Sequence, residues 1–268
     1  MGRILKGKPV RDRILEELGR KGRRVLGILR WGKDPGADWY LRGIERSVEK
    51  TGDTIVPVSV EEGGDITAAI SLIKRLKRLS DGILLLKPFP ESFDMDKMIM
   101  EVGADMDVEG IHPENLGRLL MGNPTSIPPT PGAVLELLNY YNIDTRGKHC
   151  VIVGRSEVVG KPLALLLLMK NVWDATVTVC HSKTDGLEAI TRSADILIVS
   201  IGRARFIKRR HVRRGAIVID VGINESEDGI VGDVDFEDVL DVAQGITPVP
   251  GGVGSITSAL ILKNLHSL

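Results

Sequence analysis

The sequence predicts an α/β fold with two domains, each built on a mostly parallel sheet, the second of them Rossmann-like. Along the 268 residues, apolar runs rich in β-branched residues alternate with segments of helical periodicity. That alternation is typical of β-α-β units, whose strands lie parallel. A stretch with four prolines over residues 122–132 divides one such series from a second, which indicates a domain boundary.

The first series lies before this break and alternates strands with helices. Gly52 ends its first helix, and Pro88 with Pro90 stops its third strand, because glycine favours a helix C-terminus and proline cannot donate to a sheet. The expected elements, beginning with a strand and alternating strictly, are 24–29, 38–50, 54–60, 66–79 and 81–86.

The second series follows a linking helix expected over 132–141. Its tail, 245–268, reads as a Pro/Gly-rich loop and then an apolar helix. The strands of this series are expected at 150–154, 176–180, 196–201 and 216–221, with helices at 160–171 and 186–192.

Composition excludes several functional classes. The 36 Lys and Arg balance 36 Asp and Glu, which argues against a dedicated nucleic-acid binder, since such proteins need excess basic charge to displace counterions. The longest apolar run is far shorter than the roughly 18 residues of a membrane span. Cys150 and Cys180 are too few for a disulfide scaffold or a Cys-rich metal site. The charged N-terminus lacks an apolar signal core, so we expect a cytoplasmic protein.

The balanced charge hides two local runs. Residues 203–214 hold seven basic residues and no acid, and residues 220–241 hold nine acids and no base. A solvated surface is the simpler interpretation of both. The basic run could also attract an anionic cofactor or an acidic substrate tail.

A nucleotide-binding turn is expected between residues 149 and 162. Gly154 ends a strand and Gly160 opens a helix, and a helix N-terminus offers free N–H groups to a phosphate. The standard G-x-G-x-x-G is absent, so an ordinary strand-to-helix turn remains the alternative. The next strand ends without an acid before Asp185, and Arg155 with Ser156 adds a basic and hydroxylic lining. That lining favours the 2′-phosphate of NADP over NAD, unless Ser182 and Lys183 belong to a merely exposed loop.

Six motifs occur in one order and together resemble a known family. They are Pro128-Pro-Thr-Pro131, Val153-Gly-Arg-Ser-Glu-Val-Val-Gly-Lys-Pro162, Cys180-His-Ser-Lys-Thr184, Val218-Ile-Asp-Val-Gly-Ile-Asn224, Gly232-Asp-Val-Asp-Phe236 and Thr247-Pro-Val-Pro-Gly-Gly-Val-Gly254. The chain resembles methylenetetrahydrofolate dehydrogenase/methenyltetrahydrofolate cyclohydrolase, the bifunctional FolD type, over nearly its whole length.

The resemblance implies two domains around a cleft and a homodimer. Residues 1–121, completed by a C-terminal helix over 255–268, would bind the folate, and residues 122–254 would bind NADP. The dehydrogenase step oxidises 5,10-methylenetetrahydrofolate by hydride transfer to NADP, and the cyclohydrolase step opens the methenyl ring to 10-formyltetrahydrofolate. Neither step needs a metal, because positioning and proton transfer suffice.

The resemblance also assigns site residues by their place in the motifs. Tyr40 and Glu109 would be catalytic and would contact substrate. The further substrate contacts would be Pro88, Pro250, Gly251 and Gly252. The cofactor contacts would be Gly154, Arg155, Ser156, Gly160, His181, Ser182 and Ile223.

The first domain departs from the family pattern in its reactive groups. The family has a lysine four residues after its tyrosine, one helical turn on; here Tyr40 is followed by Ile44. The glutamine of the third strand is replaced by Leu86, with Lys87 beside it. Adjacent strand residues face opposite ways, so a solvent-facing Lys87 is the simpler interpretation, although a bend at Pro88 weakens that argument. The second acid of the Asp-Val-Asp-Gly motif becomes Glu109.

These departures leave four functional hypotheses. The leading one is an NADP-dependent dehydrogenase whose cyclohydrolase activity is weak or lost, because the cofactor loops remain while the lysine and glutamine do not. The second is a fully bifunctional enzyme in which Lys87 or a water chain substitutes. The third is a non-catalytic paralogue that binds folate or NADP. The fourth is an enzyme acting on a modified pterin, since Glu109 and Leu86 lie where substrate contacts would change.

Overall fold

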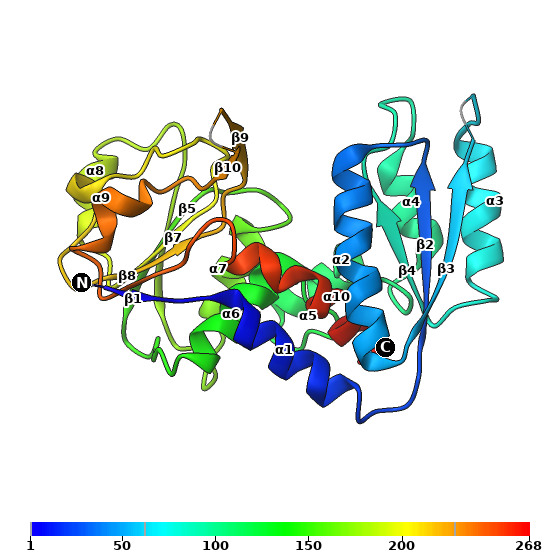
Figure 1. Ribbon diagram of the computed structural model, residues 1–268, viewed down its shortest axis with the longest axis horizontal. Helices are drawn as coiled ribbons and strands as arrows, with labels where there is room; N and C mark the ends of the chain where they lie inside the picture. The colour runs from blue at the N-terminus through cyan, green and yellow to red at the C-terminus, as the bar shows by residue number, and fades with distance from the viewer. Residues whose placement is uncertain (1, 62, 228) are drawn as a thin grey trace. The chain divides into compact units, whose positions relative to one another are not determined.

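The computed structural model describes residues 2–61, 63–227 and 229–268, which form two compact units. We call them the three-stranded unit, residues 12–129 and 258–268, and the six-stranded unit, residues up to 11 and 130–257. Both contain parallel sheets flanked by helices (Figure 1). This is the α/β class that the sequence predicts. Within the described residues, no helix is long and apolar enough to span a membrane.

The three-stranded unit has a parallel sheet in the order β3-β2-β4. Its helices are α2, α3, α4 and α5, together with the C-terminal helix α10 and the last turns of α1. The strands are β2 (Val25–Trp31), β3 (Thr54–Val60) and β4 (Gly82–Leu86). The helices are α1 (Gly7–Leu18), α2 (Pro35–Thr51), α3 (Ile66–Leu76), α4 (Met95–Val102), α5 (Pro113–Leu120) and α10 (Thr257–Leu265).

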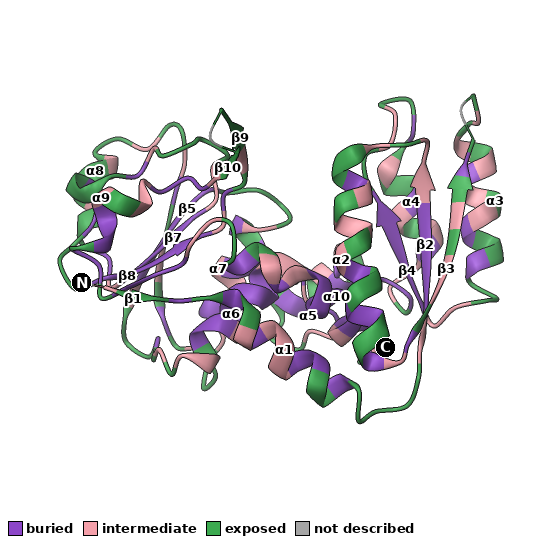
Figure 2. Cartoon of the chain, viewed as in Figure 1, coloured by how far each residue is buried: buried purple, intermediate pink, exposed green. Residues whose placement is uncertain are grey.

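Side-chain alternation gives the sheet two covered faces. Leu29, Ile83 and Leu85 join Ile73 of α3 and Met98 of α4 in one buried cluster. The alternate positions of the same strands therefore point to the other face. Strand β4 is buried throughout, whereas β3 at the sheet edge is partly exposed (Figure 2).

Helix α2 begins and ends at residues suited to those places. The side chain of Asp34 accepts a hydrogen bond from the Ala37 N–H at 2.7 Å, and Pro35 occupies the first turn. Gly52 takes the left-handed conformation at the C-terminus, with φ of 78°. An acidic N-cap, an early proline and a C-terminal glycine are strong helix boundary signals, so Tyr40 is held firmly in the second turn.

The C-terminal segment completes the three-stranded unit. The amide of Asn264 in α10 donates to the carbonyl oxygens of Val108 at 2.8 Å and of Ile127 at 2.7 Å. His266 Nε2 lies 3.0 Å from Asp53 Oδ2, and both side chains are buried. The tail is thus bound by specific polar contacts as well as by apolar packing.

The six-stranded unit has a parallel sheet in the order β1-β11-β8-β7-β5-β6. A two-stranded antiparallel ribbon, β9 with β10, accompanies it. The strands are β1 (Arg3–Ile4), β5 (His149–Val153), β6 (Thr176–Cys180), β7 (Ile196–Val199), β8 (Ile217–Asp220), β9 (Asn224–Ser226), β10 (Gly229–Val231) and β11 (Gly245–Ile246). The helices are α6 (Pro129–Tyr140), α7 (Gly160–Leu167), α8 (Leu187–Arg192), η1 (Arg209–His211), α9 (Phe236–Leu240) and η2 (Val253–Ser255).

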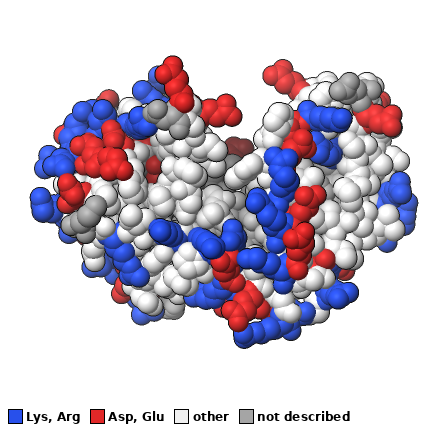
Figure 3. Space-filling view, in the orientation of Figure 1, with Lys and Arg blue, Asp and Glu red and all other residues white. Residues whose placement is uncertain are grey.

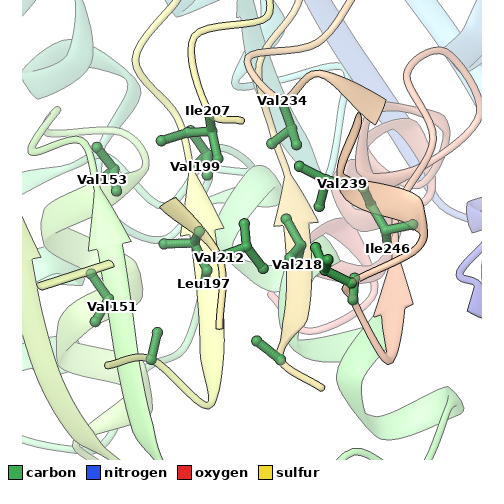
Figure 4. Packing of buried hydrophobic residues seen from close by; sticks show 14 of the residues in the cluster. Val151, Val153, Leu197, Val199, Ile207, Val212, Val218, Val234, Val239 and Ile246 are labelled. Carbon is green, nitrogen blue, oxygen red and sulfur yellow. The ribbon is translucent and has the colours of Figure 1, made fainter. Parts of the chain in front are cut away.

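The core of this unit is built from short β-branched side chains. The strands β5, β7 and β8 carry valine and leucine toward the loops and helix that cover one face (Figure 4). Parallel strands buried on both faces read as continuous apolar runs, which is why the sequence revealed them. The labelled members are Val151, Val153, Leu197, Val199, Ile207, Val212, Val218, Val234, Val239 and Ile246.

Most expected elements are present, but their ends and the chain division differ in detail. The helix expected over 66–79 ends at Leu76, and that expected over 160–171 ends at Leu167. The segment up to residue 11 belongs to the six-stranded unit, because β1 pairs with β11. The expected first domain included those residues, and its expected end at residue 121 lies before the boundary at 129.

Candidate functional site

A hollow of about 300 Å³ lies in the three-stranded unit where β4 ends and α2 begins. Open parallel sheets bind ligands at the carboxyl ends of their strands, so the position suits a ligand site. We call it the Tyr40 hollow. Its lining residues are Asp34, Gly36, Ala37, Tyr40, Leu84, Leu85, Leu86, Lys87 and Glu109.

The loop that carries Glu109 is held by the neighbouring Asp107. This carboxylate accepts the backbone N–H of Glu109 at 3.1 Å and of His112 at 2.8 Å, and the amide of Asn115 at 2.9 Å. Gly110 follows with φ of 63°, and a Cβ there would lie 2.9 Å from the backbone of Ile127. The first acid of the motif therefore builds the loop, and the second is presented to the hollow.

The environment of Glu109 favours its protonated form. Burial raises the pKa of this carboxyl from 4.5 to about 7, because desolvation penalises the charge. The charge of Lys87 and a hydrogen bond from the backbone of Leu85 lower the pKa, while Asp107 raises it. A carboxyl with a pKa near neutrality can both donate and accept a proton at physiological pH.

The two positions that depart from the family pattern are buried and apolar. Ile44 is 0% exposed and Leu86 is 4% exposed. Leu86 lines the Tyr40 hollow, and Ile44 lies one turn beyond Tyr40 on α2. Neither side chain can transfer a proton. Lys87 is exposed and also lines the hollow beside Glu109, so facing solvent and facing the hollow are compatible here.

Arg30 is a neighbour of this site that the motif analysis did not single out. It pairs with Leu86 across β2 and β4, and its Nη1 lies 2.7 Å from Asp38 Oδ1 of α2. Its Nε and Nη2 are buried without a hydrogen-bond partner among the residues the structure describes. An arginine inside an otherwise apolar strand was the available signal, because such a charge is seldom buried without a role.

A second hollow, of about 270 Å³, lies in the six-stranded unit at the carboxyl ends of β5 and β7. We call it the Gly154 hollow. Four of the predicted cofactor residues, Gly154, Arg155, His181 and Ser182, line it. The other lining residues are Val153, Leu187, Ser200, Ile201, Arg203 and Phe206.

The glycines of the turn are required by close backbone approaches. Gly154 has φ of 133°, and a Cβ there would lie 2.2 Å from the carbonyl oxygen of Ser200. A Cβ on Gly160 would lie 2.2 Å from the carbonyl oxygen of Gly154. Any side chain would therefore push the strand end from the start of α7 and spoil an anion-binding helix N-terminus.

The remaining predicted residues are distributed as follows. Ser156 lies in the same turn as Gly154 and is exposed, while Ile223 is 59% exposed in a separate loop of the six-stranded unit. The segment from Pro250 to Gly252 also belongs to this unit, where the Gly251 carbonyl accepts the N–H of Gly7 at 2.8 Å. Pro88 is exposed beside Lys87 in the three-stranded unit.

Two buried aspartates hold the loop that lines the Gly154 hollow. Asp233 accepts the backbone N–H groups of Ile201 at 2.6 Å, Gly202 at 3.1 Å and Arg203 at 2.7 Å. Asp220 accepts those of Asp233 at 3.0 Å and Val234 at 2.8 Å, and burial raises its pKa to about 7. Both acids belong to motifs that the sequence shows, but no role was predicted for either of them.

Arg203 and Phe206 were also not predicted as site residues from the sequence. The guanidinium of Arg203 lies 4.3 Å from the centre of the Phe206 ring, a stacked arrangement that holds a cation in place. Together they add a basic and an aromatic group to the Gly154 hollow. The run of charge over 203–214 was visible, but not which of its members would face the hollow.

No cluster of three or more His, Cys, Asp or Glu side chains with metal-ligand geometry occurs among residues 2–61, 63–227 and 229–268. Both cysteines are buried and unpaired, and burial raises the pKa of the Cys150 thiol to about 12. The titratable groups available at the two hollows are therefore carboxyl, phenol, imidazole and amine.

Comparison with known proteins identifies the family. Residues 128–268 match the family described as tetrahydrofolate dehydrogenase/cyclohydrolase, NAD(P)-binding domain. The bifunctional protein FolD of Prosthecochloris aestuarii is 44% identical over 93% of this chain and 90% of its own length.

Solved structures extend the likeness to the whole fold. The bifunctional FolD methylenetetrahydrofolate dehydrogenase/cyclohydrolase of Campylobacter jejuni has a TM-score of 0.95 at 37% identity, covering 100% of this chain and 98% of its own. The Trypanosoma brucei enzyme of the same type, complexed with NADP cofactor and an inhibitor, has a TM-score of 0.91 at 30% identity, covering 99% and 96%. The chain belongs to the tetrahydrofolate dehydrogenase/cyclohydrolase family.

Proposed function

We propose that this protein oxidises 5,10-methylenetetrahydrofolate to 5,10-methenyltetrahydrofolate with NADP, and that its cyclohydrolase activity is weak or lost. The observation that carries the second part is the apolar burial of Ile44 and Leu86, at 0% and 4% exposure, in a chain whose six-stranded unit keeps its nucleotide turn. The bifunctional relatives support the first part.

The Gly154 hollow is the proposed NADP site, in the six-stranded unit. Its glycine turn leaves room for a phosphate at the start of α7, and Arg155, Ser182 and Arg203 offer donors for a 2′-phosphate. Gly160, Ser156, His181 and Ile223 complete the proposed cofactor contacts. Hydride acceptance is the chemistry that NADP supplies when bound. The complex of the Trypanosoma brucei relative with NADP supports this choice.

The Tyr40 hollow is the proposed folate site, in the three-stranded unit. Glu109 would bind the pterin ring, because a carboxyl with a raised pKa can hydrogen-bond to ring nitrogens in either protonation state. Tyr40 would position the ring, with Pro88 as a further contact in the same unit. The family resemblance also proposes Pro250, Gly251 and Gly252 of the six-stranded unit as substrate contacts. The hydride leaves a carbon flanked by two nitrogens whose lone pairs stabilise the resulting cation, so oxidation chiefly requires positioning.

Hydrolysis is more demanding than oxidation in this hollow. Water must lose a proton as it adds to the methenyl carbon, and a ring nitrogen must gain one as the ring opens. Loss of a general acid or base costs about 10²–10⁴-fold in typical enzymes. With isoleucine and leucine at positions 44 and 86, we expect ring opening to be slower by about that factor than in an enzyme that keeps the lysine and the glutamine.

A two-step assay tests the proposal. NADPH formation from 5,10-methylenetetrahydrofolate is followed at 340 nm, and ring opening is followed separately with added methenyltetrahydrofolate. We expect robust NADPH formation and slow ring opening. Ring opening as fast as oxidation would contradict the monofunctional part, and no NADPH formation with NADP or NAD would contradict the whole proposal.

Restoring the missing groups sharpens the test. The double variant Ile44→Lys with Leu86→Gln should raise ring opening at least about 10-fold. The matched control, Ile44→Met with Leu86→Met, keeps both sites apolar and should leave it unchanged. Circular dichroism must show that each variant is folded. Equal rates in a folded restored variant and the control would show that these positions do not limit hydrolysis.

A second candidate is the fully bifunctional enzyme, with Lys87 as the substitute. The presence of Lys87 in the Tyr40 hollow beside Glu109 favours it. If ring opening is fast, Lys87→Ala should slow it more than 10-fold while Lys74→Ala, an exposed lysine of α3, has no effect. Fast ring opening that survives Lys87→Ala would exclude Lys87 as the substitute.

We also propose that the protein is a homodimer, in line with the family resemblance. Analytical ultracentrifugation at micromolar concentration should give about twice the 29.2 kDa of one chain. A species that stays at the chain mass at that concentration would contradict this part of the proposal without touching the others.

A further inference from the structure

A third hollow, of about 510 Å³, lies in the six-stranded unit and has no part in the proposed reaction. We call it the Arg192 hollow. It is rich in basic residues, and Figure 3 shows Lys and Arg side chains gathered where α8 and α9 lie in Figure 1, with acids among them. The lining residues are Arg192, Lys208, Arg209, Arg210, Val212, Arg214, Asp238 and Val242.

This hollow lies where strands of the sheet begin, whereas the Gly154 hollow lies where strands end. Arg192, Arg214 and Val242 each stand a few residues before the start of a strand, namely β7, β8 and β11. These strands are parallel, so their starts lie on the same side of the sheet. In the Gly154 hollow, by contrast, Val153 is the last residue of β5 and Ser200 follows the last residue of β7. A four-residue strand spans about 13 Å, and the two hollows share no lining residue.

The positive charge of the hollow is only partly neutralised. Arg209 lies 3.7 Å from Asp238, which lines the hollow, and 3.9 Å from Asp241, which does not. Arg210 lies 3.5 Å from Glu188, which is also outside the lining. Arg192 and Arg214 have no ion pair or hydrogen bond from their side chains to any residue that the structure describes. Five basic side chains thus face one lining acid, and two of their guanidinium groups are available to a ligand.

The shape and chemistry of the hollow suit a small multivalent anion. Val212 and Val242 are buried and form an apolar floor, at 5% and 9% exposure, below the basic side chains. Its volume falls within the range of small-molecule sites, about 300–1,000 Å³. Guanidinium groups bind phosphate through paired hydrogen bonds, and like charges held around one hollow repel one another until an anion enters.

We propose that the Arg192 hollow binds a compact polyphosphate group, such as that of a nucleoside triphosphate, at a site separate from the cofactor. Basic residues from three segments, the end of α8, residues 208–210 and Arg214, converge on one hollow. Because these basic residues converge on one point, they favour an anion whose charges are close together. An extended acidic chain would instead need basic residues arranged in a line. The proposal does not depend on the reaction at the Tyr40 hollow.

Isothermal titration calorimetry with inorganic tripolyphosphate tests the proposal. The whole protein is titrated at about 0.15 M salt with NADP present in saturating amount, so that the Gly154 hollow is occupied and weak surface attraction is screened. We expect one tripolyphosphate per chain. Arg192→Gln with Arg214→Gln should weaken binding at least about 10-fold.

The matched control is Arg146→Gln with Lys148→Gln, which removes two exposed basic residues of the same unit outside the hollow. It should leave the affinity unchanged. Equal weakening in both variants would show that net charge, not the hollow, binds the anion, and would overturn the proposal. So would the absence of binding, or binding that appears only when NADP is omitted.

Two further titrants decide the chemical class. ATP should bind at least as tightly as tripolyphosphate if a nucleoside polyphosphate is the ligand, and tripolyphosphate alone still supports a polyphosphate site. Citrate or triglutamate binding as tightly as tripolyphosphate would overturn the assignment to polyphosphate. Dehydrogenase activity of the Arg192→Gln, Arg214→Gln variant should equal that of the parent without added anion, which confirms its fold.

Discussion

Replacing Glu109 with glutamine should change how the stability of the three-stranded unit depends on pH. The folded protein holds the pKa of Glu109 at about 7, raised from 4.5 mainly by burial. Below pH 4.5 the carboxyl is protonated in both folded and unfolded chains, so the raised pKa has no effect. As pH rises through the interval, the unfolded chain loses the proton first, and the folded state becomes progressively less favourable.

The size of the effect follows from the two pKa values. The difference corresponds to a destabilisation of about 0.8 kcal/mol at pH 5 and about 3 kcal/mol at pH 8. Above pH 7 the penalty no longer grows, because both states are then ionised. Glutamine has no proton to lose, and its amide oxygen can still accept the hydrogen bond from Leu85. The Glu109→Gln variant should therefore gain about 2.5 kcal/mol relative to the parent between pH 5 and pH 8.

Tryptophan fluorescence can report on this unit alone. Two of the three tryptophans, Trp31 and Trp39, lie in the three-stranded unit, and Trp173 lies in the six-stranded unit. In a Trp173→Phe background, urea unfolding at pH 5 and pH 8 gives the free energy of unfolding of the unit that contains Glu109.

A stability difference between Glu109→Gln and its parent that is equal at the two pH values would refute the reasoning. The other buried carboxyl with a raised pKa, Asp220, is present in both proteins and cancels in the comparison. The control variant Glu91→Gln, at an exposed position, should show no such pH dependence.

Three further predictions concern residues that hold the sites together. Asp233→Asn should weaken NADP binding about 10-fold or more in a fluorescence titration, because it removes the charged acceptor of three loop N–H groups. Unchanged affinity would mean that this loop is not needed for binding the cofactor. Gly154→Ala should weaken it by a similar factor, because its Cβ would lie 2.2 Å from a backbone oxygen, whereas Gly117→Ala, in open space, should not. Asn264→Leu should lower the free energy of unfolding of the three-stranded unit by about 2–4 kcal/mol, because two carbonyl oxygens lose their donor; a loss below 1 kcal/mol would contradict that account.

Elements with a continuous apolar pattern were predictable from the sequence, and those without one were not. Strands β3 and β6 begin and end where expected, at Thr54–Val60 and Thr176–Cys180. Strand β1 has two exposed residues, Arg3–Ile4, and is defined by pairing with β11, 242 residues away. Helix α5 begins where His112 accepts a backbone N–H and Pro113 opens the first turn. These signals are local, so a search for long apolar periodicity does not detect them.

The lining of the two candidate hollows was predictable where a motif fixes the backbone and not where the fold brings distant side chains together. Gly154 and Gly160 are required by close approaches that any βα turn of this kind makes. Arg203, by contrast, lines the Gly154 hollow on a loop whose backbone is held by Asp233, 30 residues away. Lys87 shows the limit of strand alternation, because it lies just past the end of β4, where that rule no longer applies.

The interleaved chain also sets the order in which a ribosome can finish each unit. Strand β1 belongs to the six-stranded sheet, but its partner β11 is synthesised 242 residues later, at Gly245–Ile246. The three-stranded unit must wait longer still, since α10 with its Asn264 follows β11 in the chain. Neither unit can be obtained intact by cutting the gene at one point, so mixing halves from two relatives would require exchanging both ends of the chain along with the matching middle.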